Sequence, residues 1–325
     1  YHMKIFWINI MRVILVGSLF LLGCADQRPD AQEQIDGSKE RLSIVATTTQ
    51  IKDIVSQLLG DSCRIYSLMG PGVDPHLYKP TARDMTNITS ADLVIYHGLK
   101  LEGKLASTIE KATNNKIIAY AVSSPIPEEK LLASDDKASP YPDPHIWFDP
   151  EIWTQCVHGL ANLLSEMLPD SKNQIRERAA QLETEYRQIS KWARTKIQSL
   201  PAKDRKLITS HDAFRYFGRS FGMQVISLQG ISTLQEAGLG DRANLVDYIK
   251  KNQVRCLFVE SSVNPKALNE IAKETGISIG APLFSDALGS SKSKIIGPDQ
   301  VEHTLDTWTG MMIHNIQSIV QGLSP

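Results

Sequence analysis

The chain has 325 residues and a net charge of −1, with 42% hydrophobic and 22% charged residues. This length is enough for two domains of ordinary size, and the composition is typical of globular proteins. Because 35 Lys and Arg residues balance 36 Asp and Glu residues, the chain lacks the basic excess of a nucleic-acid-binding protein, and we expect no nucleic-acid partner.

The N-terminus has the pattern of an export signal. An apolar run, residues 13–23, follows Lys4 and Arg12 and ends at Cys24. It is well short of the ~20 residues that span a bilayer. Its last residues and Cys24 read LLGC and resemble a bacterial lipobox, in which the cysteine carries lipid. Residues 1–24 are therefore predicted to be a signal peptide with a lipobox; a signal that is simply cleaved is the alternative.

Residues 25–41 are polar and poor in bulky apolar side chains. Such a segment cannot bury enough apolar surface to fold, so it predicts a flexible tether.

Short apolar runs then alternate with helical patterns. In the first half, the predicted strands are residues 42–46, 64–68, 93–96 and 116–121, and the predicted helices are residues 51–59 and 101–112. In the second half, the predicted strands are residues 206–209, 224–228, 256–259 and 277–279, and the predicted helices are residues 213–221, 243–252, 265–275 and 305–323. Strands alternating with helices indicate a parallel sheet. The pattern occurs twice, which predicts an α/β fold of two similar lobes, residues 42–168 and 201–325.

A long helix is predicted over residues 169–200, between the two lobes. Residues 171–200 contain neither Gly nor Pro. One apolar stripe recurs at spacings of three and four residues, formed by Leu182, Tyr186, Ile189 and Trp192. At roughly 45 Å, such a helix is long enough to join both lobes and to restrict hinge motion between them.

Four side chains in turn-rich contexts are candidate metal ligands: His76 in VDPHLYKP, His145 in PDPHIWF, His211 in ITSHDAF and Asp286 in PLFSDALG. His76 and His211 follow predicted strands, and ligands of open α/β sheets bind beyond the carboxyl ends of the strands. A proline fixes the backbone ahead of each of the first two histidines. The fold must bring the four together, because they are far apart in the sequence.

Three imidazoles and one carboxylate suit Zn²⁺, Mn²⁺ or Fe²⁺, whereas Ca²⁺ would need more oxygen ligands. Four protein ligands leave no position for an activated water, which favours holding the metal over catalysis. Because the imidazoles must be deprotonated, metal affinity is expected to fall as the pH drops through about 6.

The segments VDPHLYKP, HIWFDP, SHDAFRYFG, FVESS and LFSDALG resemble those of the metal-binding lipoproteins that serve ABC importers, the cluster A-I or cluster 9 solute-binding proteins. The resemblance runs from about residue 42 to the C-terminus and is greatest to the spirochaetal and chlamydial branch. It implies two pseudo-symmetric βα lobes with parallel sheets joined by one long linking helix. One metal ion would lie between the lobes, with His76 and His145 from the first lobe and His211 and Asp286 from the second.

The resemblance also implies a monomeric protein that is not an enzyme. It would capture one divalent ion (Zn²⁺, Mn²⁺ or Fe²⁺) in the periplasm or at the extracytoplasmic face of the inner membrane, held there only through a lipid anchor. It would deliver the ion to an ABC importer permease. His211 matches zinc binders and mixed-metal members, but the long loop of residues 123–144 lacks the histidines that many zinc binders carry there. The metal therefore stays open.

Two further acids lie near the candidate ligands. Glu260 ends the predicted strand 256–259 and is a candidate to hydrogen-bond a ligand imidazole; a structural salt bridge is the alternative. Asp212 is interpreted as a helix-cap acid. A zinc-dependent hydrolase would need a general base, for which these two are the only candidates. An adhesin is the other alternative function.

Several residues are predicted to serve the fold instead of the site. His97 stands where the family usually has asparagine and is interpreted as a polar residue at a strand end. Cys63, Cys156 and Cys256 are expected to be buried and unpaired.

Overall fold

The computed structural model describes residues 41–112, 117–134 and 140–324. The predicted signal peptide, Cys24 and all but the last residue of the predicted tether lie outside the described residues. No helix of the described part is long and apolar enough to cross a membrane.

The N-terminal half, up to helix α4, contains a four-stranded parallel sheet in the order β2-β1-β3-β4. Its strands are β1 (Leu42–Ala46), β2 (Cys63–Ser67), β3 (Leu93–Tyr96) and β4 (Ile118–Ala121). The helices are α1 (Thr49–Leu59), α2 (Ala82–Ser90), α3 (Lys104–Ala112) and α4 (Pro150–Met167). The two central strands are short runs of mostly buried apolar residues, as expected for a parallel sheet covered on both faces.

The C-terminal half, from strand β5 onward, repeats this arrangement. Its parallel strands are β5 (Lys206–Thr209), β6 (Gln224–Ser227), β7 (Cys256–Leu257) and β8 (Ser278–Ile279). A bridge between Thr209 and Phe258 joins the β5 and β7 segments. The resulting order β6-β5-β7-β8 matches β2-β1-β3-β4, so the predicted α/β fold with two pseudo-symmetric βα units is confirmed. Helices α6 (Arg215–Phe221), α7 (Leu239–Asn252) and α8 (Lys266–Thr275) connect these strands.

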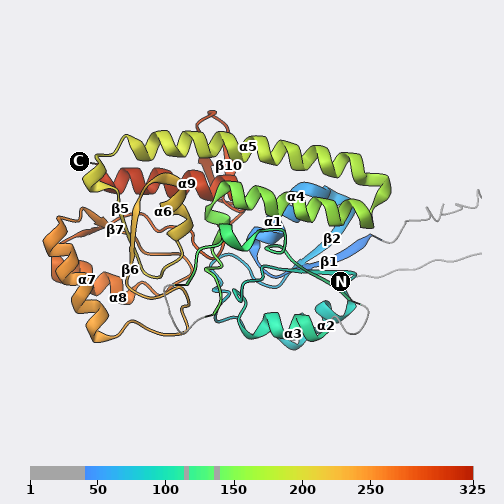
Figure 1. Ribbon diagram of the computed structural model, residues 1–325, viewed down its shortest axis with the longest axis horizontal. Helices are drawn as coiled ribbons and strands as arrows, with labels where there is room; N and C mark the ends of the chain where they lie inside the picture. Colours follow the sequence, from blue (N-terminus) through green and yellow to red (C-terminus); the bar gives the residue numbers. More distant parts are fainter. Residues whose placement is uncertain (1–40, 113–116, 135–139, 325) are drawn as a thin grey trace, which may run out of the picture. The chain divides into compact units, whose positions relative to one another are not determined.

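Helix α5 (Lys172–Gln198) follows α4 and links the two halves, as predicted. It packs along α4, and also along α9 (Trp308–Leu323), the last helix of the chain (Figure 1). Its buried face consists of Ile175, Ala179, Leu182, Tyr186, Ile189, Ala193 and Ile197. This spacing places the stripe on one side of the helix. The largest apolar core includes residues of both halves, from Ile44 to Leu323. The lobe boundaries drawn from the sequence stay a prediction.

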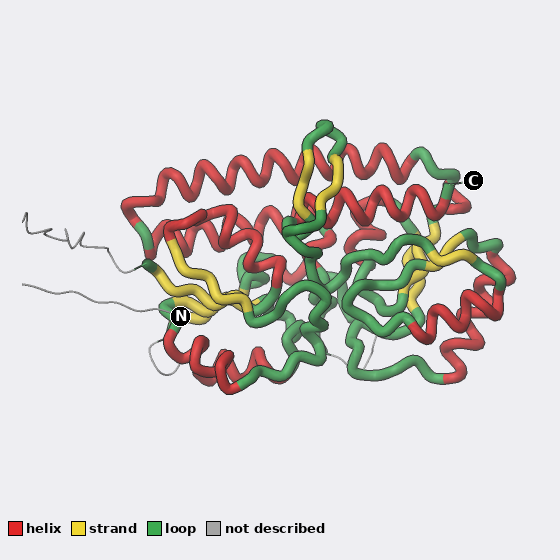
Figure 2. Tube along the Cα trace, turned by 180° about the vertical axis from the view of Figure 1, so that it is seen from behind, coloured by secondary structure: helices red, strands yellow, loops and turns green. Residues whose placement is uncertain are grey.

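Two local predictions are corrected, and one hairpin was not predicted. The helix expected over residues 101–112 begins only at Lys104, because Gly103 has a positive φ angle, which a right-handed helix does not accommodate. The strand expected over residues 256–259 is regular only at Cys256–Leu257, and Phe258 adds a single bridge to Thr209. The hairpin of β9 (Lys294–Ile296) and β10 (Glu302–Thr304), which lies beside the long helices in Figure 2, had not been predicted.

The remaining regular segments are single 3₁₀ turns at Gly60–Ser62, Glu128–Lys130, Ile146–Phe148, Pro169–Ser171 and Ala202–Asp204. The predicted loop of residues 123–144 contains only one of them in its described part.

Cys63, Cys156 and Cys256 are free and buried, as predicted. Burial raises the pKa of each thiol, that of Cys63 to about 11. They therefore stay protonated at neutral pH and pack as small apolar groups.

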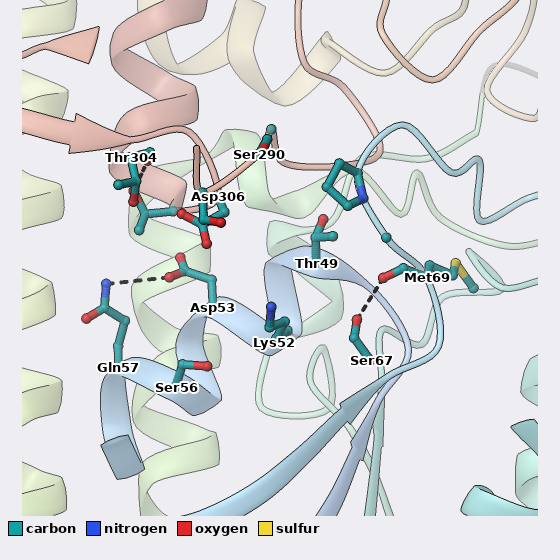
Figure 3. A pocket seen from close by; sticks show the side chains of 15 residues that line it. Thr49, Lys52, Asp53, Ser56, Gln57, Ser67, Met69, Ser290, Thr304 and Asp306 are labelled. Atoms are coloured by element: carbon teal, nitrogen blue, oxygen red, sulfur yellow. Dashed lines mark hydrogen bonds between the residues drawn. The ribbon is translucent and has the colours of Figure 1, made fainter. Parts of the chain in front are cut away.

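One buried carboxyl joins the start of α9 to α1. Asp53 Oδ2 accepts the backbone N–H of Trp308 at 2.8 Å, which satisfies a donor at the N-terminus of α9. Figure 3 shows Asp53 between Gln57 and Asp306. Burial, together with the charges of Glu185 and Asp306, outweighs the hydrogen bonds and raises the pKa of Asp53 to about 7.

Asp53→Asn should therefore change how stability depends on pH. Between pH ~4 and ~7 the folded chain holds a proton on Asp53 that the unfolded chain has lost, so stability falls as the pH rises through this window. Asparagine keeps an acceptor for Trp308 and removes the titration. Urea unfolding should show the variant gaining on the order of 1–3 kcal/mol relative to wild type between pH 5 and pH 8. Equal differences at the two pH values would show that Asp53 is ionised throughout.

Candidate metal centre

Two aspartate–proline–histidine turns present the candidate ligands of the N-terminal half. In each turn the aspartate Oδ1 accepts the backbone N–H of the histidine two residues later. His76 N lies 2.8 Å from Asp74 Oδ1, and His145 N lies 3.0 Å from Asp143 Oδ1. The aspartate bond and the fixed φ of proline hold the backbone, so each imidazole starts from a defined position.

The His145 side chain is oriented by the same aspartate. Its Nδ1 donates to Asp143 Oδ1 at 2.8 Å, which leaves Nε2 without a proton when the ring is neutral. Trp147 packs against the ring with centroids 5.3 Å apart. The imidazole is fully buried and its Nε2 is available to a metal.

His211 follows β5 and is held by Glu260, which follows β7. The backbone N–H of His211 donates to Glu260 Oε1 at 2.9 Å, and His211 Nδ1 lies 2.5 Å from Glu260 Oε2. The structure therefore places Glu260 against a candidate ligand, in the position considered from the sequence. A carboxylate at Nδ1 again directs Nε2 to the opposite side.

The loop carrying Asp286 is held from both halves. Asn315 on α9 accepts from Phe284 N at 2.9 Å and donates to Phe284 O at 2.7 Å. Trp147 in the N-terminal half donates from Nε1 to Ser285 O at 3.0 Å. Sequence reasoning missed Asn315; the signal was an asparagine on the apolar, buried face of the last helix.

The structure brings all four predicted ligands together. One ligand atom from each of His76, His145, His211 and Asp286 lies within 4.8 Å of the other three. His145 Nε2 is 3.4 Å from His76 Nε2 and 3.4 Å from Asp286 Oδ1; His211 Nε2 is 3.2 Å from Asp286 Oδ2. A tetrahedral site with bonds of about 2.0–2.1 Å has its ligand atoms about 3.3–3.4 Å apart. The spacing therefore fits a four-coordinate metal ion.

Burial supports the same interpretation. His145, His211 and Asp286 are at most 1% exposed, and His76 is 8% exposed. Neither oxygen of Asp286 accepts a hydrogen bond of normal geometry among the described residues; the Nε2 atoms of the three histidines lie 3.2–3.9 Å away. A buried carboxylate with only such long contacts is costly, and a cation held among the three imidazoles would remove that cost.

The charges around the cluster set its protonation. Burial lowers the pKa of His145, but the hydrogen bond and charge of Asp143, with those of Asp286, raise it to about 9. Against the same effect of burial, Glu260 and Asp286 raise the pKa of His211 well above its usual value. Despite burial, His211 and His145 hold the pKa of Asp286 well below its usual range. Burial lowers the pKa of His76 to about 3, so in the metal-free cluster at neutral pH His145 and His211 carry protons and His76 does not.

Other histidines lie apart from this cluster. His97 Nε2 lies 2.7 Å from Pro144 O, so it contacts the backbone of the turn that carries His145. His158 Nε2 pairs with Glu183 Oε2 at 2.9 Å, and His314 Nε2 contacts a backbone carbonyl at 2.8 Å. Asp212 is not a member of the cluster either.

A polar cavity of about 450 Å³ lies beside α1 (Figure 3). Residues of both halves line it, among them Thr49, Lys52, Asp53, Ser290, Asp306 and Thr307. None of the four candidate ligands is among its lining residues. We place the candidate site at the histidine cluster because donor chemistry, and not empty volume, defines a metal site.

Comparison with known proteins gives consistent matches. Residues 44–322 match the family model described as zinc-uptake complex component A, periplasmic. The manganese-binding lipoprotein MntA of Bacillus subtilis is 37% identical over 321 residues, 97% of this chain and 99% of that protein. The zinc-binding protein TroA of Treponema pallidum is 35% identical over 286 residues, 86% of this chain and 88% of that protein. The solved structure of the same treponemal protein has a TM-score of 0.79 at 34% identity and covers 87% of this chain and 99% of that one.

The pH dependence of metal affinity tests the role of Asp143. Because Asp143 helps to raise the pKa of His145 to about 9, affinity for Zn²⁺ should fall from pH 9 to pH 7, a window above the pH of about 6 expected from the sequence. Asp143→Asn keeps the turn acceptor but removes the charge. It should lower affinity at pH 9 by roughly 10–100-fold. It should also make the fall between pH 9 and pH 7 shallower, because protons compete less for the variant's His145.

Competitive titration with a chelator of known affinity at several pH values would measure both effects. Parallel pH profiles for wild type and variant would contradict the assigned role of Asp143.

Proposed function

Because the chain belongs to the family of periplasmic zinc-uptake components, we propose that His76, His145, His211 and Asp286 capture one divalent transition-metal ion for delivery to an ABC-type importer. The family consists of substrate-binding components and not of enzymes, which removes the zinc-dependent hydrolase alternative. No feature of the described residues favours the adhesin alternative.

One observation carries this proposal. Four buried ligand atoms, one from each residue, converge from both halves of the chain, and the two oxygens of Asp286 accept no hydrogen bond of normal geometry in the described residues. The Asp286 oxygens lie 3.2–3.9 Å from the Nε2 atoms of the three histidines, farther than in a charge-assisted hydrogen bond of about 2.7–2.9 Å and near the separation of ligands that share one metal ion. In a transport site, the charge of this carboxylate is neutralised by the metal ion only while the ion is bound.

The geometry favours Zn²⁺ over Mn²⁺ as the more tightly bound ion. Three imidazoles and one carboxylate at tetrahedral spacing suit Zn²⁺, whereas Mn²⁺ prefers more oxygen ligands and six-fold coordination. Affinity for a given site also rises from Mn²⁺ through Fe²⁺ to Zn²⁺. Tight binding does not by itself identify the transported ion, since relatives are named for both zinc and manganese.

The partner that family membership implies is the membrane-embedded part of a metal importer. We propose that the protein acts as a monomer outside the cytoplasm and is held at the membrane by lipid on Cys24. The LLGC sequence at the end of the apolar run supports this anchor, as does the description of MntA as a lipoprotein.

Metal stoichiometry tests the central proposal. Protein purified without chelator should hold about one equivalent of metal by elemental analysis, and competitive titration should rank Zn²⁺ above Fe²⁺ and Fe²⁺ above Mn²⁺. The double variant His76→Ala with Asp286→Ala should lose this equivalent, because two of the four ligands are gone. His158→Ala is the matched control, since this histidine lies on the surface of α4 and away from the cluster. Wild-type affinity in the double variant would sink the proposal.

The anchor is tested separately. Expressed in a bacterial host that lipidates its own lipoproteins, the wild-type chain should be found in the membrane fraction. Cys24→Ser should move it to the soluble periplasmic fraction, because a thioether-linked lipid can no longer form. Equal distribution of the two proteins would show that the signal is simply cleaved.

A further inference from the structure

A strap, defined as residues 229–238, connects β6 to α7 and has no regular secondary structure. Its base lies beside His211. Gln229 N donates to Ser210 O at 2.9 Å, and Asp212 N donates to Gly230 O at 3.2 Å. The base of the strap therefore holds the residues on both sides of one candidate ligand.

The tip of the strap reaches the opposite half of the chain. Thr233 donates from Oγ1 to Asp74 Oδ2 at 2.5 Å. Asp74 is the residue whose other oxygen, Oδ1, accepts the backbone N–H of His76 at 2.8 Å. One carboxylate thus connects the strap to the backbone of a second candidate ligand.

The two aspartate–proline–histidine turns differ in what they do with this carboxylate. In the second turn, Asp143 Oδ1 binds both the backbone N–H and the ring Nδ1 of His145. In the first turn, the second oxygen of Asp74 is used for Thr233, which is distant in the sequence. A turn-forming aspartate needs only its first oxygen, so the contact with Thr233 is an addition to the turn.

The contact between Thr233 and Asp74 lies near the surface. Thr233 is only partly buried, and the neighbouring Leu234 is 66% exposed. A hydrogen bond to a charged acceptor contributes more than a neutral one, and a single such bond at a surface can break without disturbing the core. The contact is therefore strong enough to retain the closed arrangement and accessible enough to be released.

We propose that Thr233 is a positioning residue that latches the strap onto Asp74 and thereby keeps His211 and His76 together around the bound metal ion. This inference rests on the proposed function. The latch acts on retention: metal enters before the strap closes, and it leaves only after the Thr233–Asp74 bond has opened. Breaking the bond should therefore raise the dissociation rate and leave the association rate unchanged.

The test compares three single variants. Thr233→Val has nearly the same shape but cannot donate; Thr233→Ser restores the donor. Ser232→Ala removes a neighbouring hydroxyl whose contact, from Leu234 N at 3.4 Å, stays inside the strap. Dissociation of Zn²⁺ into excess chelator would be followed by stopped flow, together with association and with thermal unfolding of the metal-free proteins.

Thr233→Val should dissociate roughly tenfold or more faster than wild type, while Thr233→Ser and Ser232→Ala should stay near the wild-type rate. Association and metal-free melting should be the same in all four proteins, which a general loss of stability would not allow. In the Asp74→Asn background, Thr233→Val should add little, because the acceptor oxygen is already absent.

Equal dissociation rates for Thr233→Val and wild type would overturn the latch while leaving the proposed function intact. Failure of wild type to bind Zn²⁺ at all would overturn both.

Discussion

The buried anion of Asp286 is the constraint to which the surrounding structure responds, because among the described residues its charge is balanced only by the histidines around it. In the absence of metal, charge must come from protons on His145 and His211, and these protons are stabilised by Asp143 and Glu260. The carboxylates of Asp143 and Glu260 therefore act in both states of the cluster. Without metal they stabilise the imidazolium ions, and with metal they would make the neutral imidazoles stronger metal ligands. Metal capture at the proposed site would exchange one dication for protons.

The fold meets this constraint from two directions. Parallel strands deliver His76 and His211 from equivalent edges of two sheets that share one strand order. The third and fourth ligands come from irregular segments. Asp143, two residues before His145, fixes that histidine, and Asn315, distant in the sequence, fixes the loop that carries Asp286. Helix α5 and one apolar core extend through both halves, and they hold the residues that support the ligands in fixed positions relative to one another. Under the proposed latch, release of the ion requires the Thr233–Asp74 bond to open.

Much of this could be predicted from local sequence. Strands β1, β3 and β5 were placed at their observed bounds because they are short apolar runs bounded by polar or turn residues. Helix α2 was missed because its nine residues are mostly polar and its start depends on a capping box between Thr81 and Asp84. The ligand turns were identifiable because proline and aspartate mark them in the sequence. The roles of Asn315 and Thr233 were not, since each makes its decisive contact with a residue far away in the chain.

The three buried thiols have a consequence for how the protein matures. Cys156 and Cys256 are no more than 2% exposed, Cys63 is 8% exposed, and all three are unpaired. A neutral, enclosed sulfur is a poor nucleophile and a poor soft-metal ligand. The folded part of the chain thus needs no oxidant to form disulfides, and its described residues offer copper and other thiophilic ions no accessible thiol to compete with the histidine cluster. Burial of the thiols therefore adds to metal selectivity, because it removes sulfur ligands that would favour soft ions over those that bind the histidine cluster.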